Sequence, residues 1–189
     1  MAPGSKRIIG ITGTPGTGKK SVAPFLARSL GVPCVGLNDL ARTAGLVRRG
    51  QEVDAALLKR QVSARVTGPA VVYGHLLPHS VVKSSVDWVG VLRCEPAVLK
   101  ARLESRGYAE AKALENVRAE LIGLVSDEAF RAFGREKTVE VDTTATSPEE
   151  AAEALLLSAK RRGADRSRID WMRGYDSAAK LRSLLPSER

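Results

Sequence analysis

Apolar residues in this chain fall into short runs, separated by longer stretches in which apolar positions recur at helical spacing. The runs cover residues 7–12, 32–35, 70–73, 88–92 and 138–142. Short apolar runs bounded by glycine or polar residues are typical of buried strands, and strands that alternate with helices form a parallel sheet. The pattern predicts an α/β fold with a five-stranded, doubly wound parallel sheet.

The stretches between the runs begin and end with helix signals. Helices are expected over residues 19–30, from Asn38 or Asp39 through Val47, and over 52–66, 96–106, 110–130 and 148–162. Gly31 and Gly107 are in the position of helix stops. Residues 147–150, Ser-Pro-Glu-Glu, form a capping box with proline at the first helical position. Each expected strand is therefore followed by a helix, as a doubly wound sheet requires.

The turn between the first strand and the first helix carries the strongest motif. Residues 13–19, Gly-Thr-Pro-Gly-Thr-Gly-Lys, have the glycine and lysine spacing of a phosphate loop. The glycines let consecutive N–H groups turn inward around a phosphate, while the helix N-terminus and the lysine add positive charge. A turn that only joined strand to helix would need fewer glycines. We expect a triphosphate site formed by Gly13, Gly16, Thr17, Gly18, Lys19, Lys20 and Ser21.

The position after the loop lysine departs from the general motif. Lys20 stands where a serine or threonine usually ligates Mg²⁺, and a lysine cannot ligate a metal. Mg²⁺ keeps several of its waters and binds phosphate oxygens, so it can accompany ATP without a protein cage. The sequence therefore predicts ATP and Mg²⁺ as cofactors, and it assigns no residue as a metal ligand.

Charged side chains that suit a phosphate acceptor follow the second and third strands. Asp39 and Arg42 lie after the second strand, where guanidinium groups match the geometry of a monophosphate. Arg48 and Arg49 lie in the same segment. For any one of these arginines taken at random, a surface position on a helix is the more common role. His75 follows the third strand, where it could orient a water or an acceptor hydroxyl; a structural histidine is an equal alternative.

Arg102 and Arg106 lie near a short turn that joins two expected helices after the fourth strand. Their spacing of four residues places them on one face of a helix. A lid arginine that contacts the transferring phosphoryl group stabilises its developing charge, and lid closure excludes water. We expect a lid at about residues 106–118 and an acceptor-binding insert at about 37–66.

The length and composition favour one domain. A chain of 189 residues, 43% of them hydrophobic, can bury one α/β core with small inserts. No signal segment opens the chain and no apolar run approaches twenty residues, so we expect a cytoplasmic protein without membrane contact. Cys34 and Cys94 lack the spacing of zinc ligands and are expected to be small buried residues. The expected division is a P-loop domain over 1–162 and a basic extension over 163–189.

The net charge of +9 indicates polyanionic partners, which include nucleotides and could extend to RNA. Residues 160–189 hold nine Lys and Arg against four Asp and Glu, so this tail carries +5 of the total. A solvated basic face and a nucleic-acid contact are equally open readings of it. The tail also contains Ile169, Trp171, Met172, Tyr175, Leu181 and Leu184. We therefore expect it to fold back on the domain or to dock a partner.

These motifs together resemble the adenylate kinase isoenzyme 6 family, also known as coilin-interacting nuclear ATPases, and in particular its archaeal members. The similarity runs over about residues 6–162. Its marks are Thr-Gly-Thr-Pro-Gly at 12–16, Asp-Leu-Ala-Arg at 39–42, Gly-His at 74–75, Arg-Leu-Glu-Ser-Arg-Gly-Tyr at 102–108 and Glu-Asn at 115–116. Two positions differ from the family, because Tyr73 replaces an acidic residue and Lys20 replaces a threonine.

The resemblance implies phosphorylation of AMP by ATP, an ATPase activity, and a role in small-ribosomal-subunit maturation through a platform ribosomal protein and precursor rRNA. The candidate catalytic residues are Lys19, His75 and Arg106, and Arg106 also belongs to the ATP site. The candidate residues for the acceptor AMP are Arg42, Asp39 and Arg102.

Three functions fit these residues to different degrees. A nucleoside monophosphate kinase is the first hypothesis, and it needs no side-chain base because its acceptor is already an anion. The alternative is an ATP-gated ribosome assembly factor with little kinase activity, which the basic tail favours. A small-metabolite kinase is less favoured, because a hydroxyl acceptor normally requires a carboxylate base and Tyr73 removes the obvious one.

Overall fold

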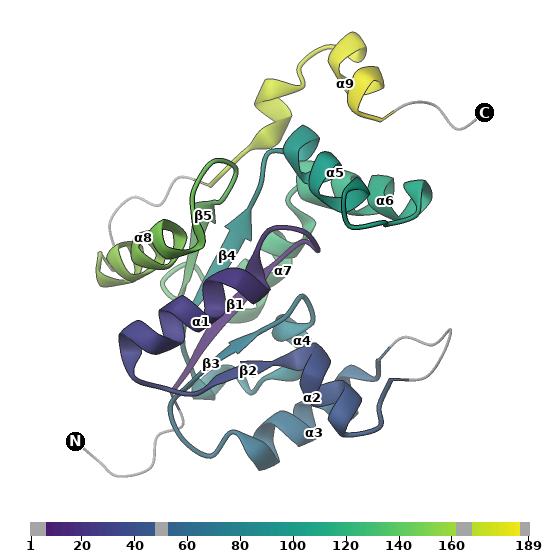
Figure 1. The fold of residues 1–189 in the computed structure, drawn as a ribbon. Coiled ribbons are helices and arrows are strands. Elements are labelled where there is room, and N and C mark those ends of the chain that lie inside the picture. Colours follow the sequence, from purple (N-terminus) through teal and green to yellow (C-terminus); the bar gives the residue numbers. More distant parts are fainter. Residues whose placement is uncertain (1–6, 48–52, 162–167, 186–189) are drawn as a thin grey trace.

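The computed structural model describes residues 7–47, 53–161 and 168–185. Within them, one parallel sheet contains β1 (Ile8–Gly13), β2 (Cys34–Gly36), β3 (Ala70–Tyr73), β4 (Val86–Arg93) and β5 (Thr138–Asp142). The strand order is β2-β3-β1-β4-β5 (Figure 1). The predicted five-stranded, doubly wound parallel sheet is confirmed.

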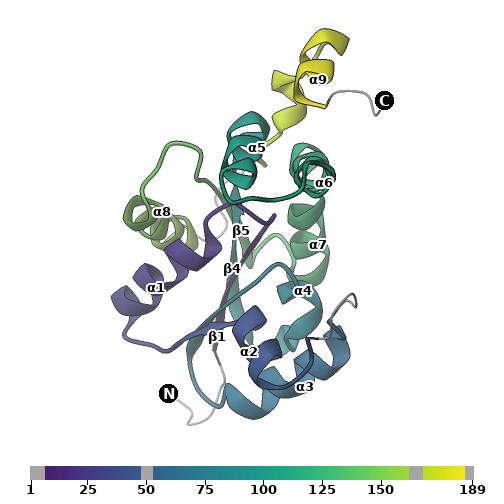
Figure 2. The same ribbon diagram turned by 45° about the vertical axis from the view of Figure 1, so that its right-hand side comes forward.

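Helices cover both faces of this sheet, as Figure 2 shows. On one face lie α1 (Lys19–Leu30) and α8 (Pro148–Lys160), which bury the core around Ile11, Leu26 and Leu155. On the other face lie α2 (Leu37–Thr43), α3 (Ala55–Arg65), α4 (Leu77–Ser80) and α7 (Leu124–Phe133). Their core includes Leu77, Val89 and Phe133. The sheet is thus buried on both sides, which explains why its strands read as apolar runs.

The chain reverses its winding direction between β1 and β3, which are neighbours in the sheet. It leaves β1 through α1 on one face and leaves β3 through α4 on the other. In open α/β sheets, ligands bind at such a switch point, beside the carboxyl ends of the strands. The phosphate loop and His75 follow these two strands, so the topology brings them to the same crevice.

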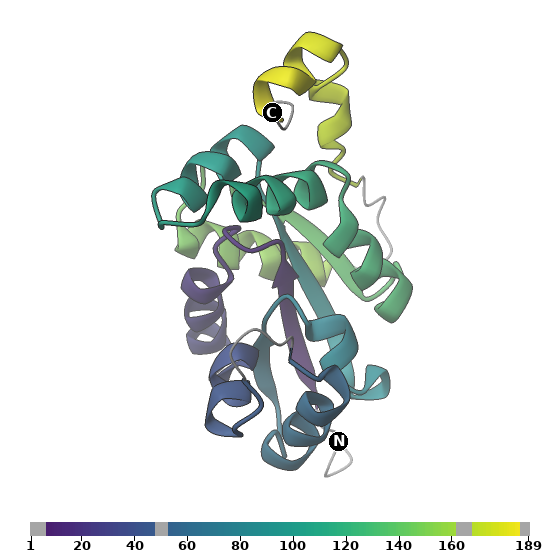
Figure 3. The ribbon, with the colours of Figure 1, turned by 90° about the vertical axis from the view of Figure 1, so that its right-hand side faces the viewer.

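A third hydrophobic cluster lies beyond this end of the sheet, between α5 (Pro96–Glu104), α6 (Glu110–Leu121) and the C-terminal segment 168–185. The segment contains the 3-10 helix η2 (Trp171–Gly174) and α9 (Ala178–Leu184). It packs on the far side of α5 and α6 from the sheet (Figure 3), with Leu184 buried and Trp171 and Tyr175 partly buried. The tail therefore folds back on the domain, one of the two outcomes expected from its apolar residues.

The prediction of a single helix over 110–130 is wrong, because this segment forms two helices, α6 and α7. Gly123 adopts φ 69° between them. The buried Arg93 donates through Nη2 to the carbonyl of Glu120 (2.9 Å), which ends the ladder of the first helix. After the break, Leu124 at the start of α7 is 45% exposed.

Other boundaries differ in ways that move individual residues. α5 ends at Glu104 rather than residue 106, so Arg102 and Arg106 do not share a helix face. α2 is capped by Gly36, which places Asn38 and Asp39 inside its first turn. Cys34 is exposed because β2 is an edge strand, whereas Cys94 is buried as predicted.

Some expectations lie partly outside the described residues. Arg48, Arg49 and the predicted helix start at residue 52 belong to the part that is not described. In the described part, α3 begins after Asp54, whose carboxylate accepts from the backbone N–H groups of Ala56 and Leu57. No helix among the described residues has both the length and the apolar character needed to cross a membrane.

Candidate nucleotide-binding site

The phosphate loop has the backbone geometry that its glycines predict. Gly13 has φ 143°, and a Cβ there would lie 2.4 Å from the carbonyl oxygen of Leu92. Gly18 has φ 98° and precedes α1 without any side-chain cap, and the first turn of α1 contains no acidic residue. The N–H groups at this helix start are therefore not capped by a side chain, and the helix dipole favours an anion in front of them.

Lys19 bridges the two ends of the loop. Its ammonium donates to the carbonyl oxygens of Gly13 (2.6 Å) and Thr14 (2.9 Å). Burial lowers the pKa of Lys19 from 10.5 to about 7, with Glu120 opposing the shift and Arg106 adding to it. Desolvation penalises a buried ammonium unless an anion compensates. A bound phosphate would supply that anion and return the pKa of Lys19 toward its ordinary range.

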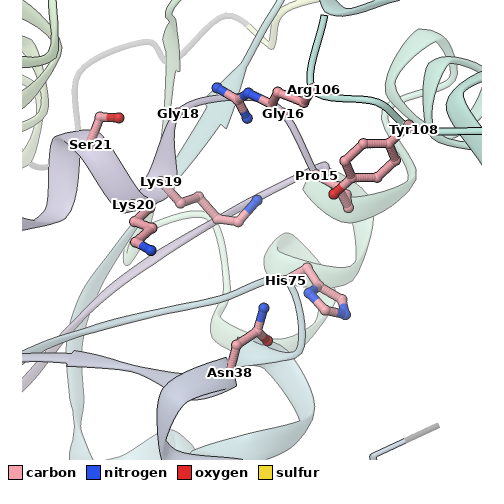
Figure 4. Close-up of a pocket in the computed structure, with 10 residues that line it drawn as sticks. All are labelled: Pro15, Gly16, Gly18, Lys19, Lys20, Ser21, Asn38, His75, Arg106 and Tyr108. Atoms are coloured by element: carbon pink, nitrogen blue, oxygen red, sulfur yellow. The ribbon is translucent and has the colours of Figure 1, made fainter. Parts of the chain in front are cut away.

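The loop forms one wall of a cavity of about 260 Å³. Figure 4 shows the Lys19 amine extending into the space between Arg106 on one side and His75 and Asn38 on the other. These groups come from the loop after β1, the turn after α5, the turn after β3 and the start of α2. The lining residues are Pro15, Gly16, Gly18, Lys19, Lys20, Ser21, Asn38, His75, Arg106 and Tyr108.

His75 is half-buried at the carboxyl end of β3. Burial lowers its pKa, and the positive charges of Lys19 and Lys112 lower it further. The imidazole is therefore neutral at pH 7, with one nitrogen able to accept and the other able to donate a hydrogen bond. A neutral ring beside the lysine suits the orientation of a water or of a phosphate oxygen.

The structure brings most of the predicted residues together. Gly16, Gly18, Lys19, Lys20, Ser21, His75 and Arg106 all line the cavity. Gly13 and Thr17 lie beneath it: the hydroxyl of Thr17 donates to the carbonyl of Thr14 (2.9 Å), and the hydroxyl of Thr143 donates to the carbonyl of Thr17 (2.9 Å). These two residues shape the loop from below.

The predicted acceptor residues do not line the cavity. Arg42 donates to Asp39 (3.0 Å), and both side chains are exposed on α2. Arg102 instead donates to the carbonyls of Thr143 (2.8 Å) and Thr144 (3.0 Å), where it joins α5 to the loop after β5. The interpretation of Arg102 as an acceptor-binding residue gains no support from this geometry, because the early end of α5 separates it from Arg106.

Sequence reasoning did not identify two polar residues of the cavity. Asn38 was considered only as a helix cap, yet it lines the cavity from the first turn of α2. Tyr108 follows Gly107, whose φ of 75° turns the chain back toward the loop. The predicted helix stop at Gly107 could have indicated that Tyr108 lies near the phosphate loop. The orientation of Asn38 could not be predicted in this way, because it depends on where α2 begins.

The oxygen-bearing side chains of the cavity are neutral: Ser21, Asn38 and Tyr108. Among the residues that the structure describes, no group of three or more His, Cys, Asp or Glu could hold a metal ion. Tyr73 lies beside Asp39, and burial raises the pKa of its hydroxyl, with Asp39 and Cys34 adding to the shift. The donor set does not fit a protein-held Mg²⁺, whereas it fits the phosphates of a nucleotide that brings its own metal.

Solved structures share the fold of this chain. A gluconokinase from Sinorhizobium meliloti 1021 superposes with a TM-score of 0.55 at 19% identity, covering 83% of this chain and 93% of its own. A shikimate kinase from Acinetobacter baumannii gives a TM-score of 0.55 at 15% identity, covering 82% and 95%. At this identity the likeness shows the α/β P-loop kinase fold.

Sequence comparison is more specific. The family model for an AAA domain matches residues 9–123. A protein named "Putative adenylate kinase" from Thermococcus onnurineus is 38% identical over 173 residues, covering 89% of this chain and 93% of its own. A protein of the same name from Methanothermobacter thermautotrophicus is 41% identical over 154 residues, covering 78% and 86%. The chain therefore belongs to the P-loop family that the AAA-domain model describes and that these archaeal proteins represent.

Proposed function

We propose that this protein is an adenylate kinase that converts ATP and AMP into two ADP. The observation that carries the proposal is the convergence of Lys19, Arg106 and the uncapped start of α1 on one cavity, in a chain whose relatives are named for this activity. Cations on two sides of one space suit a phosphoryl group that passes between two phosphates.

The ATP side of the proposed reaction is the phosphate loop. The backbone N–H groups around Gly16 and Gly18 would hold the β-phosphate, and Lys19 would contact the β- and γ-phosphates. Lys20 and Ser21 stand at the same helix start, and Arg106 lies across the cavity, where it would stabilise charge on the transferring group. Mg²⁺ enters this reaction as part of the MgATP substrate.

The acceptor side is the α2 segment with His75. Asn38 already reaches the cavity, and Arg42 stands one turn further along the same helix. An AMP phosphate would compete with Asp39 for the Arg42 guanidinium, and His75 would orient it or a water next to Lys19. No general base is needed, because the attacking oxygen of AMP is already an anion.

A second candidate function is that of an ATP-gated ribosome assembly factor, in which slow ATP hydrolysis accompanies binding of a platform ribosomal protein and precursor rRNA. The net charge of +9 and the resemblance to the adenylate kinase isoenzyme 6 family support it. We place the chain in that subfamily, in the cytoplasm, as part of this proposal. Here the kinase site would serve mainly to bind and hydrolyse ATP.

Product analysis separates the two functions. Purified protein is incubated with Mg²⁺ and ATP, with and without AMP, and ADP and inorganic phosphate are followed separately. Two ADP per ATP consumed, dependent on AMP and without free phosphate, is the expected result. Phosphate release that is indifferent to AMP would overturn the kinase proposal and favour the assembly factor.

A further inference from the structure

A buried polar cluster lies directly beneath the phosphate loop and takes no part in the reaction proposed above. It consists of Thr14 in the loop, Arg93 at the end of β4, Glu120 on α6 and Trp171 in the C-terminal segment. We propose that Glu120 is a positioning residue for the phosphate loop, and that Trp171 of the tail holds Glu120 in place. The inference rests on the proposed nucleotide site, and it makes the tail a part of that site.

Glu120 is 1% exposed, and both of its carboxylate oxygens are occupied. Oε2 accepts from the Thr14 hydroxyl at 2.5 Å. Oε1 accepts from Arg93 Nε (2.8 Å), from the backbone N–H of Cys94 (3.0 Å) and from Trp171 Nε1 (3.1 Å). A buried carboxylate is tolerated only when a cation and hydrogen-bond donors compensate its desolvation. This set supplies both, so the position of the carboxylate is fixed.

The contact with Thr14 connects that fixed carboxylate to the lysine of the loop. The Thr14 hydroxyl donates to Glu120, and the Thr14 carbonyl accepts from Lys19 Nζ. Thr14 therefore links the Glu120 carboxylate to the Lys19 ammonium. The negative charge of Glu120 also raises the pKa of Lys19, against the effects of burial and of Arg106. Glu120 thus acts on the loop in two ways, by holding Thr14 and by favouring a protonated lysine.

The tail reaches the same cluster through its backbone as well as through Trp171. Arg93 Nη1 donates to the carbonyl of Ile169 (3.0 Å), and the N–H of Ile169 donates to Glu140 Oε2 (2.7 Å). Glu140 in turn accepts from Arg93 Nη1 at 2.8 Å. The cation that neutralises Glu120 is therefore oriented partly by the tail, and tail docking and loop geometry depend on the same side chains.

A second contact of the tail provides a matched control. The Tyr175 hydroxyl donates to the carboxylate of Glu95, which caps the N-terminus of α5. This contact belongs to the same docked segment but has no hydrogen bond to Glu120 or to the loop. Tyr175→Phe therefore removes one tail contact without touching the proposed connection.

The test measures ADP binding by calorimetry, which does not require turnover, on the full chain. Glu120→Gln keeps the shape and removes the charge, and we expect binding to weaken about tenfold at pH 7.5. If ADP binding requires a protonated Lys19, it should weaken as pH rises, and in Glu120→Gln that loss should begin at lower pH, because burial and Arg106 then lower the pKa of Lys19 without the opposing carboxylate. Thr14→Val should weaken binding about threefold, and it should add little to Glu120→Gln because the two share one contact.

Trp171→Phe keeps a smaller aromatic ring and removes the N–H donor, and we expect it to weaken ADP binding about threefold, whereas Tyr175→Phe leaves binding unchanged. Equal effects of the two tail variants would overturn the role of Trp171. If Glu120→Gln or Thr14→Val binds ADP with a Kd within twofold of that of the unmodified protein, Glu120 does not position the loop. If Glu120→Gln does not fold, Thr14→Val alone gives the answer. Lys19→Ala tests the proposed site separately, because intact binding in that variant would overturn the nucleotide site itself.

Discussion

The two sides of the cavity are built in opposite ways. On the ATP side, the loop rests on buried groups, with Thr14, Thr17 and Glu120 all at most 1% exposed. On the acceptor side, the side chains of Arg42 and Asp39 are 71% and 55% exposed and contact each other. The ATP side therefore has its geometry before any ligand binds. On the acceptor side, the Arg42 and Asp39 side chains are oriented by a solvent-screened ion pair, which contributes little energy.

This difference in burial suggests that the two sides of the proposed kinase site have different roles. A preorganised phosphate site binds without a large entropic cost and stabilises charge where it develops. An exposed arginine and aspartate can exchange partners when a monophosphate arrives. Damage to the loop should therefore affect everything the protein does, and damage to α2 should affect only the acceptor.

The largest effect is expected for Lys19→Ala. This change removes the side chain that donates to the carbonyls of Gly13 and Thr14 and reaches into the cavity. We expect kcat/KM for ATP to fall by about 10²–10³-fold, the cost of losing one preorganised charge at the transferring group. Steady-state kinetics with a coupled ADP assay measures it. Lys59→Ala, at an exposed position of α3 that does not line the cavity, is the matched control, and equal losses in both variants would contradict a specific role for Lys19.

The second effect concerns stability. Gly13→Ala places a methyl group 2.4 Å from the Leu92 carbonyl at φ 143°, where backbone must shift to make room. We expect the free energy of unfolding to fall by about 2–3 kcal/mol, together with nucleotide binding. Urea denaturation measures the first quantity. Gly68→Ala is the control, because a Cβ there has no neighbour within 4 Å, and a similar loss in that variant would show that strain at the loop is not the cause.

The phosphate loop could be predicted from the sequence, but the buried groups that hold it in place could not. Five apolar runs and one glycine-rich turn predicted the sheet and the position of Lys19, because both signals are local. The break between α6 and α7 depends on Arg93, which comes from a strand 27 residues before Glu120. No periodicity in residues 110–130 reports such a contact, and the same holds for Trp171 on Glu120, 51 residues away. The place of Asn38 in the cavity was missed because α2 begins at Leu37, earlier than predicted, which puts Asn38 inside the helix rather than at its cap.

The third effect is a pH dependence of ATP binding. The pKa of Lys19 is about 7 in the free protein and, by the argument above, higher when phosphates are bound. Below pH 7 the ammonium is already charged and affinity should be level; above pH 7 binding must take up a proton, so affinity should fall by up to about tenfold per pH unit. Calorimetry between pH 6 and 9, in two buffers of different ionisation enthalpy, measures both the slope and the proton uptake.

Lys19→Arg sharpens this prediction, because a guanidinium stays protonated throughout that range. The variant should bind more weakly but lose the slope above pH 7. A slope that persists in Lys19→Arg would assign the titration to another group of the cavity, such as His75.

The smallest effect is expected on the acceptor side, and it tests directly whether the exposed acceptor side acts independently of the buried ATP side. Arg42→Ala removes an exposed guanidinium whose described partner is Asp39, so stability should change by less than about 0.5 kcal/mol. We expect KM for AMP to rise about tenfold, the value of one charge-assisted contact to a phosphate, while KM for ATP stays within twofold. Arg60→Ala, an exposed arginine on α3, should change neither constant. If Arg42→Ala instead raises both KM values together, the two sides of the cavity are coupled, and the independence inferred from their different burial is wrong.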